Sequence, residues 1–323
     1  MPCIAGNVGA VTAGVIHSEE PQQEKAMTLL VDVGTNAEIV LGDENRLLAC
    51  SSPTGPAFEG AQISAGQRAA AGAIERVRID PDTLVARFKV IGSDLWSDEP
   101  GFIEETSKFG VTGICGSGII EVVAEMYLSG IVTVDGIIDG ELASRSPLVV
   151  ADGRTWSYVL YQSDLTENQA PILVTQNDIR QIQLAKAALY AGVKLLMDKL
   201  DIDHVDRIRL AGAFGSHINV QHAMVLGLIP DCALNQVSSA GNAAGTGARI
   251  ALLNNQSRNT IEDLVTNIEK IETAMEPKFQ QYFVDAMAFP NKTDPFPNLF
   301  STIDKPPEKL ITESPGGRKR RRR

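Results

Sequence analysis

The residue types best suited to chemistry lie in a short turn between two apolar runs. Asp32 ends the first run, the turn contains Gly34, Thr35 and Asn36, and a second β-prone run begins at Glu38. Glycine reaches backbone conformations closed to other residues, so this strand–turn–strand segment could come close to a ligand. Its amides and the Thr35 hydroxyl would face an anion, and Asp32 could hold a divalent cation directly or through water. The alternative is an ordinary hairpin with a polar turn.

Three later glycine-rich segments have features of nucleotide-contacting loops. The first precedes an apolar helix pattern at 113–118, the second joins a predicted strand to a helix at 210–215, and the third lies at 241–245. Free N–H groups and a positive dipole end make a helix N-terminus a phosphate site, and small residues let a flat base approach the backbone. The sequence therefore predicts further nucleotide contacts from Gly113, Gly116, Ser117, Gly118, Gly212, Ala213, Phe214, Gly215, Gly241, Asn242 and Gly245.

The order of these segments resembles the sugar kinase, heat-shock cognate and actin (ASKHA) superfamily of ATPases. It is more closely similar to one branch, the reductive activators of corrinoid-dependent enzymes. The resemblance covers residues 2–253 and rests on PCIAGNVGA (2–10), LLVDVGTNAEIVLG (29–42), GPAFEGAQIS (55–64), GAIERV (72–77), GICGSGIIE (113–121), TQNDIRQIQLAKAAL (175–189), LAGAFG (210–215), GLIP (227–230) and GNAAGTGA (241–248). It implies an α/β fold of the ribonuclease H-like, actin-like kind: a mixed sheet flanked by helices, with a helical C-terminal extension.

The resemblance also implies a role for the chain. Family members are ATP-driven electron donors that reduce an inactivated Co(II) corrinoid to Co(I) on a partner corrinoid protein or methyltransferase. ATP and Mg²⁺ are the implied cofactors, with Mg²⁺ held by Asp32 directly or through water. The loop at 55–64, with Glu59 and Ser64, is the implied face for the corrinoid partner, although Ser64 could equally cap a following helix. Superfamily members often pair through this lobe, so a homodimer is a further expectation.

Two family features are missing from this sequence. Members usually begin with a plant-type [2Fe–2S] domain of C-x4-C-x2-C spacing, whereas the four cysteines here are scattered. The superfamily fold has two lobes, each beginning with an Asp-x-Gly hairpin, and we find one such hairpin. We therefore expect the C-terminal half of a longer protein, with the N-terminal lobe and the ferredoxin-like [2Fe–2S] domain outside this chain. A competing mapping takes 32–36 as the first-lobe hairpin and 113–118 as the second, but the latter lacks an aspartate and opens a helix.

Some single residues carry smaller predictions. Val11 replaces an aspartate of the family pattern, and it is expected either to face the cleft between the lobes, which would weaken ATPase activity, or to lie in a buried strand. Cys115 lies at a predicted helix start, where a thiol pKa can fall. Cys3, Cys50 and Cys232 are expected to be small apolar residues in a reducing compartment. His217 follows the segment at 210–215 and could lie near the base.

Composition and charge restrict the kind of partner. Of 323 residues, 44% are hydrophobic and 21% are charged, which is ordinary for a globular protein. The last six residues are all basic, so residues 1–317 carry a formal charge of −17 within a total of −11. Such an acidic body argues against nucleic-acid binding. No apolar run is long enough to span a membrane and no signal peptide is recognised, so a cytoplasmic location is expected.

The expected organisation has four segments. They are the end of a preceding lobe with a linker (1–26), a nucleotide-binding lobe (27–254), a helical extension (255–290) and a mostly disordered tail (291–323). Within the lobe we expect three strands at 27–50, a helix at 66–76, a strand at 88–91 and a helix at 175–200. Thr175 and Asp178 predict a capping box at the start of that last helix, whose apolar stripe is expected in the core.

Three functions are compatible with these features. The first is ATP-dependent reductive activation, performed by a longer protein of which this chain is an incomplete part. The second is a small-molecule kinase of the same superfamily, which would need a carboxylate base near an acceptor hydroxyl. The third is a non-catalytic lobe for nucleotide sensing or assembly.

Overall fold

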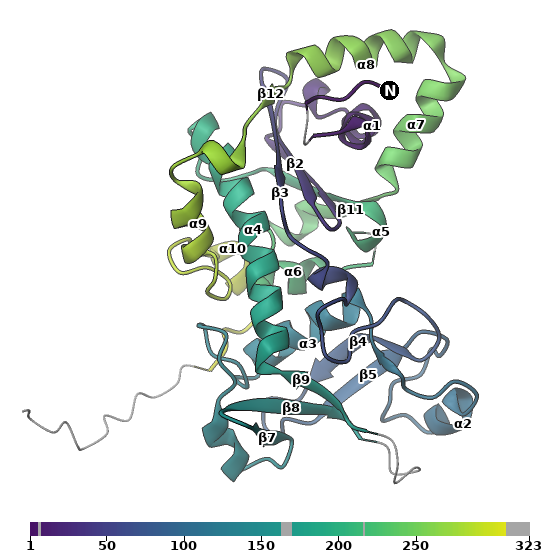
Figure 1. The fold of residues 1–323 in the computed structure, drawn as a ribbon, viewed down its shortest axis with the longest axis vertical. Coiled ribbons are helices and arrows are strands. Elements are labelled where there is room, and N and C mark those ends of the chain that lie inside the picture. The colour runs from purple at the N-terminus through teal and green to yellow at the C-terminus, as the bar shows by residue number, and fades with distance from the viewer. Residues whose placement is uncertain (6–7, 163–169, 216, 308–323) are drawn as a thin grey trace, which may run out of the picture.

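A six-stranded mixed sheet forms the centre of the upper half of the molecule (Figure 1). The computed structural model describes residues 1–5, 8–162, 170–215 and 217–307. The strand order is β11-β10-β1-β2-β3-β12. Strands β1, β2 and β3 form an antiparallel meander. Strand β10 pairs in parallel with β1, β12 pairs in parallel with β3, and β11 pairs in parallel with β10. The strands are β1 (Thr28–Val33), β2 (Ala37–Gly42), β3 (Leu47–Ser52), β10 (Arg207–Ala211), β11 (Val237–Gly241) and β12 (Glu269–Lys270).

Both faces of this sheet are covered, because consecutive side chains of its apolar strands point to opposite faces. Leu30 and Val40 pack in one cluster with Val15 and Leu264, beneath α1 (Ala10–Glu19), α7 (Ala243–Leu253) and α8 (Asn255–Asn267). The long helix α4 (Gln176–Leu200) covers the other face and contacts β2 and β3. Two short helices, α5 (Gly212–Gly215) and α6 (Val220–Leu226), follow β10. The three strands predicted at 27–50 are confirmed, and the structure shows that they pair as a meander.

Helix α4 begins as the sequence predicts. The Thr175 hydroxyl accepts a hydrogen bond from the Asp178 backbone N–H, and the Asp178 carboxylate accepts one from the Thr175 backbone N–H. This reciprocal pair satisfies two N–H groups at the helix start. Ile182 and Leu189 are fully buried, so the apolar stripe lies in the core.

A second group of elements lies in the lower half of Figure 1, and α4 runs down to it from the main sheet. One small sheet contains β4 (Ala73–Ile79), β5 (Ala86–Val90) and β6 (Gly113–Ile114), and another contains β7 (Val149–Asp152), β8 (Thr155–Tyr161) and β9 (Ile172–Thr175). Helix α3 (Gly116–Leu128) packs on β4, and α2 (Phe102–Thr106) lies at the edge. The short 3-10 turns are Pro21–Gln23, Ala57–Glu59 (η2), Gly140–Ser144, Leu234–Gln236 and Thr273–Met275.

Residues 66–76 do not form the predicted helix. They form a loop that leads into β4, where Ile74 and Val77 are buried against α3 and pair with β5. Gly72 has a φ of +87°, and a Cβ there would lie 2.6 Å from the Gly110 carbonyl oxygen. The cross-strand pairing and this turn outweigh the helical propensity of the alanines at 69–71.

The C-terminal segment is more ordered than predicted. After α9 (Phe279–Asp285), Phe296 and Leu299 are buried around α10 (Pro297–Phe300), and Asp231 accepts a hydrogen bond from the Asn298 backbone N–H. The buried Lys186 donates to the carbonyl oxygen of Pro290 at 2.7 Å. The expectation of a disordered tail is therefore wrong for 291–307, and 308–323 lies outside the described residues.

The N-terminal segment packs closely on the main lobe. Helices α1 and α7 cross at Gly14 and Gly247, where a Cβ on Gly247 would lie 2.0 Å from the Gly14 carbonyl oxygen. The segment 1–26, predicted to be the end of a preceding lobe with a linker, contains helix α1 from Ala10 to Glu19. The proposed domain boundaries stay predictions. No described helix is long and apolar enough to cross a membrane.

Candidate functional site

Three of the predicted segments meet at one edge of the main sheet. Strands β1, β10 and β11 run parallel, so their carboxyl ends lie side by side. Asp32 pairs with Ala211, the residue before Gly212, and Ala211 pairs with Gly241. The carboxyl edge of parallel strands is where open α/β sheets commonly bind ligands. The segments at 32–36, 212–215 and 241–245 are thus brought together from distant parts of the sequence.

The turn between β1 and β2 offers backbone donors. Among the described residues, no acceptor is found for the N–H groups of Thr35 and Asn36, whereas the Gly34 N–H donates to the Asn36 carbonyl oxygen at 3.1 Å. The buried Thr54 hydroxyl is within hydrogen-bond distance of the carbonyl oxygens of Gly34 (2.8 Å) and Thr35 (3.1 Å) and holds the turn in place. Two unpaired amides on a fixed turn suit an anion.

Gly34 does not have the left-handed conformation that the sequence suggested. It is absent from the described residues with positive φ, and a Cβ on it would lie 3.4 Å from the Asn36 carbonyl oxygen. A Cβ at that distance would make an ordinary van der Waals contact, so neither backbone conformation nor space requires glycine here, and the conformational argument is wrong at this position.

Asp32 has a second carboxylate opposite it. Because the turn is short, Asp32 on β1 pairs directly with Glu38 on β2. Burial raises the pKa of the Asp32 carboxyl. Burial and then the charge of Asp32 raise the pKa of Glu38 to about 7, against hydrogen bonds from its own backbone and from Ser51 that lower it. Sequence reasoning missed Glu38 as a site residue, although counting three turn residues between the strands would have placed it opposite Asp32.

Gly212 leaves room for Asp32. Its φ is +86°, and a Cβ there would lie 2.5 Å from Asp32 Oδ1. Only glycine therefore combines this backbone conformation with this carboxylate position. Gly215, at the end of α5, is buried against Leu210, where a Cβ would lie 3.0 Å from the backbone carbonyl carbon. The backbone of Ala213 and Phe214 belongs to α5, and their side chains lie outside the described part of the structure.

The segment at 241–245 begins helix α7. Gly241 has a φ of +59° and Asn242 caps the helix, since its Oδ1 accepts from the Gly245 N–H at 2.9 Å. The exposed Asn242 thus already uses this oxygen within the chain. Contact of this segment with a nucleotide stays a prediction.

The glycines at 113–118 have a packing role. A Cβ on Gly118 would lie 2.2 Å from the Ile74 carbonyl oxygen, and one on Gly113 would lie 2.7 Å from the Ala65 carbonyl oxygen. Ser117 is buried, with its hydroxyl 3.3 Å from Cys115 Sγ. Gly116 starts α3, which packs on β4 of a separate sheet. The structure joins this segment to β4 rather than to the strands of the main-sheet edge, and its predicted nucleotide contacts stay untested.

The two residues predicted for a partner face have internal contacts. Glu59 lies on η2 and accepts a hydrogen bond from the Thr35 hydroxyl at 3.0 Å. The Ser64 N–H and hydroxyl lie 2.8 and 3.0 Å from Asp178 Oδ1, in the capping box of α4. Ser64 therefore supports α4, far along the chain, rather than capping a following helix.

The remaining predicted residues are now placed. Val11 is 56% exposed in the first turn of α1, so the buried-strand alternative is wrong. His217 is exposed, and its carbonyl oxygen accepts from Arg76 at 3.1 Å. Cys115 is buried and donates to the Ile74 carbonyl oxygen. Burial raises the pKa of Cys50, and it raises that of Cys232 to about 11, so these two thiols stay protonated near neutral pH.

A large pocket lies elsewhere, between residues 127–145, Trp156 and the N-terminal half of α4. None of the predicted nucleotide residues lines it. The sheet edge is the better candidate for the functional site, because carboxylates, unpaired amides and a close-packed glycine lie together there at the ends of parallel strands.

The sheet order and the flanking helices define a ribonuclease H-like lobe of the ASKHA type. Residues 26–300 match the family model described as the C-terminal domain of RACo, the ASKHA domain. The chain therefore belongs to this family.

Characterised relatives carry related names. The corrinoid activation enzyme RamQ of Eubacterium limosum is 34% identical over 295 residues, which is 89% of this chain and 46% of that protein. The [Co(II) methylated amine-specific corrinoid protein] reductase of Methanosarcina barkeri is 25% identical over 280 residues, which is 84% of this chain and 46% of that protein. A solved reductive activator for a corrinoid, iron–sulfur protein superposes with a TM-score of 0.78 at 31% identity, covering 94% of this chain and 45% of that one. The chain thus spans about half the length of these relatives.

Proposed function

We propose that this chain is the nucleotide-binding half of a reductive activator that returns a Co(II) corrinoid to Co(I) on a partner corrinoid protein or methyltransferase. One observation supports it most: Asp32, Gly212 and the unpaired Thr35 and Asn36 amides meet at the carboxyl edge of β1, β10 and β11. The names of the relatives support the same role, because each describes activation or reduction of a corrinoid protein.

The residues at the edge fit MgATP. Asp32 and Glu38 are carboxylates paired across the hairpin. Burial is the main cause that raises the pKa of each, and a divalent cation beside them would favour their ionised forms. The Thr35 and Asn36 amides would meet phosphate oxygens, and the backbone of 212–215 would lie against adenosine. Bound ATP would supply free energy to the whole protein, by favouring one conformation to the extent of its differential affinity. This chain's residues bind and orient the nucleotide.

The electron would come from outside this chain. Reduction of Co(II) to Co(I) consumes one electron, which a reduced [2Fe–2S] cluster would supply while becoming oxidised. No group of three or more metal-ligating side chains is found among the described residues. We place the cluster in an N-terminal ferredoxin-like domain that belongs to the half of the relatives this chain does not span.

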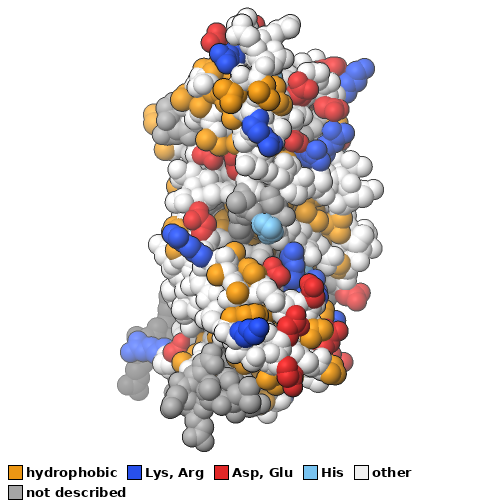
Figure 2. Space-filling view, turned by 90° about the vertical axis from the view of Figure 1, so that its right-hand side faces the viewer, with side chains coloured by type: hydrophobic (Ala, Val, Ile, Leu, Met, Phe, Trp, Pro, Cys, Tyr) orange, Lys and Arg blue, Asp and Glu red, His pale blue; other side chains and the backbone are white. Residues whose placement is uncertain are grey.

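Exposed apolar side chains suit the missing lobe. Val11 on α1 and Leu252 and Leu253 on α7 are 56, 72 and 85% exposed. Figure 2 shows hydrophobic side chains gathered in the upper third of the molecule, the height of α1 and α7 in Figure 1. Patches of this kind mark protein interfaces. A homodimer through this surface is the alternative occupant. The loop with Glu59 and Ser64 remains the proposed face for the corrinoid partner.

The proposal is tested by calorimetric titration of MgATP into the chain and into Asp32→Ala. We expect saturable binding that the substitution abolishes. No binding at millimolar MgATP would contradict nucleotide binding by this half alone. Supplying the upstream half and following the absorbance of a Co(II) corrinoid then separates reductive activation from the kinase alternative and from a non-catalytic sensing lobe, since only an activator produces Co(I).

A further inference from the structure

The Thr35 hydroxyl has a hydrogen-bond partner within the chain. It donates its one hydrogen to Glu59 Oε1 at 3.0 Å, and both side chains are exposed. A hydroxyl has a single O–H donor, so it cannot donate to Glu59 and to a phosphate oxygen at the same time. The Glu59 carboxylate, which belongs to this chain, therefore lies where an anionic ligand of the turn would bind.

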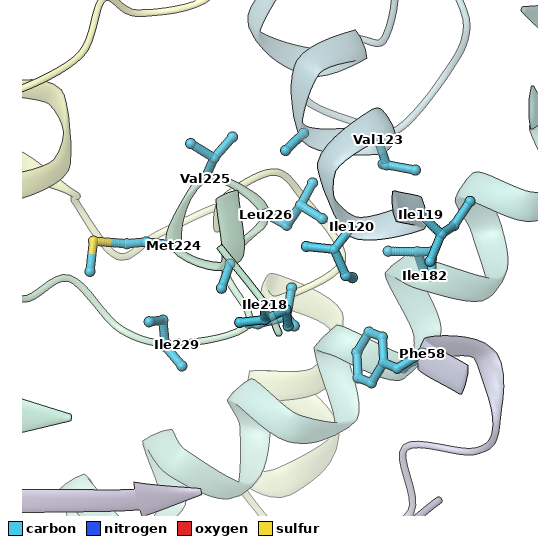
Figure 3. Close-up of a cluster of buried hydrophobic side chains, with 14 of the residues drawn as sticks. Phe58, Ile119, Ile120, Val123, Ile182, Ile218, Met224, Val225, Leu226 and Ile229 are labelled. Carbon is cyan, nitrogen blue, oxygen red and sulfur yellow. The ribbon is translucent and has the colours of Figure 1, made fainter. Parts of the chain in front are cut away.

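The backbone around Glu59 is fixed. Phe58 is fully buried, and Figure 3 shows its ring directed toward Ile119 and Ile120 of α3 and Ile182 of α4. Gly60, which directly follows Glu59, has a φ of +84°, and a Cβ on it would lie 3.0 Å from the Gln67 backbone. Thus η2 cannot withdraw without breaking the core, and only the Glu59 side chain is free to move away from the turn.

A second clamp joins this loop to the turn. The Gly55 N–H donates to the Thr35 carbonyl oxygen at 2.9 Å, and the Thr54 hydroxyl contacts the carbonyl oxygens of Gly34 and Thr35. The Glu59 contact is therefore part of a fixed arrangement of the loop and the turn.

Three carboxylates lie around the turn between β1 and β2. Asp32 and Glu38 lie on the strands that it joins, and Glu59 reaches it from η2. Within the described part of the chain, no Lys or Arg side chain forms an ion pair with Asp32, Glu38 or Glu59. A polyphosphate without a cation would meet this negative charge unscreened, whereas a cation-bound one would bring compensating charge with it.

We infer that Glu59 is a specificity-determining residue that makes the turn accept phosphate only together with a divalent cation. It holds the Thr35 hydroxyl and repels a bare polyphosphate. When the cation accompanies the phosphate, the Glu59 side chain rotates away and Thr35 donates to the phosphate instead. This inference rests on the proposed nucleotide site and deepens it.

The test is calorimetry with Mg²⁺-bound ATP and with ATP in excess chelator, on wild type and on Glu59→Gln. Removing one charge about 5 Å from a phosphate, in a water-like dielectric, is expected to tighten metal-free ATP binding about fourfold per unit of ligand charge. Mg²⁺ cancels two of the negative charges of ATP, so the same substitution is expected to tighten MgATP binding by a clearly smaller factor. The preference for MgATP over metal-free ATP therefore falls, and the difference shrinks at high salt because Glu59 is exposed.

The matched control is Glu104→Gln on α2, which removes an exposed carboxylate far from the edge and should leave the preference unchanged. A wild-type preference retained in Glu59→Gln overturns the inference while the nucleotide site stands. Weaker MgATP binding by Glu59→Gln also overturns it, because Glu59 would then be a cation ligand. If neither nucleotide binds to wild type or variant, the proposed site fails and the inference fails with it.

Discussion

The pKa of Glu38 gives a measurable prediction about stability. It is raised from 4.5 to about 7 in the folded protein. The folded state therefore binds more protons than the unfolded state between these pH values, and the free energy of unfolding falls as the pH rises through this window. Taken in full, the shift corresponds to about 3 kcal/mol. Solvent reaches part of the carboxyl and screens it, so we expect about 1–2 kcal/mol.

The perturbation is Glu38→Gln, which keeps the size of the side chain and removes its charge. Urea unfolding at pH 5 and pH 8 should find the variant more stable than wild type by about 1–2 kcal/mol at pH 8 and nearly equal to it at pH 5. Glu104→Gln on the exposed face of α2 controls for a change in net charge. An unchanged difference between wild type and Glu38→Gln from pH 5 to pH 8 would refute the raised pKa of Glu38, which burial and then the charge of Asp32 cause.

The same group reports on cation binding. A divalent cation beside Asp32 and Glu38 would stabilise the ionised form of both, so Glu38 should release a fraction of a proton when MgATP binds near pH 7. Titration in two buffers of different ionisation enthalpy measures that release. It should disappear in Glu38→Gln, and a release that persists in the variant would assign the proton to another group.

Two further substitutions test the sheet edge at Gly212 and the buried ion pairs of Glu121 on α3. Gly212→Ala places a Cβ 2.5 Å from Asp32 Oδ1, so urea unfolding should find a loss of about 2–4 kcal/mol and calorimetry a loss of MgATP binding. Gly110→Ala has a similar φ, +69°, with nothing within 4 Å, so it should lose only the strain of about 1–2 kcal/mol and keep binding; equal losses would contradict the clash. Glu121→Gln weakens the buried contacts of Glu121 with Arg76 and Arg78 at 2.9 and 2.6 Å and should cost about 2–3 kcal/mol by urea unfolding. Glu104→Gln is its control, and an equal effect in both would remove the buried network as a source of stability.

Local patterns predicted local structure well. The apolar runs around 27–50 gave the meander, and Thr175 with Asp178 gave the start of α4, because a ladder between neighbouring strands and a capping box depend on residues close in the sequence. Predictions failed where distant partners decide. The strand at 73–79 exists because it pairs with β5 and packs under α3, and 296–299 is ordered because it packs against Asp231 and α6.

The predicted site shows the same division. The turn at 32–36 was proposed from its residue types, and Gly212 and Gly241 from strand-to-helix patterns. The structure brings these segments together at one edge, and their contact with a nucleotide stays a prediction. Neither Glu38 nor the contact of Glu59 with Thr35 was predicted, since the first requires the register of the hairpin and the second a loop that folds back across it.

Glycine spacing alone does not separate binding from packing in this chain. Gly118 and Gly247 are needed because a Cβ would lie 2.2 and 2.0 Å from backbone oxygens of Ile74 and Gly14, where helices pack closely on neighbouring elements. Gly212 is needed because a Cβ would displace a carboxylate at the open edge of the sheet. The sequence places all three in similar glycine-rich segments, so the segments predict nucleotide contact equally. What distinguishes Gly212 is the identity of the atom that a Cβ would meet, and that atom belongs to Asp32, the residue from which the proposed cation site is built.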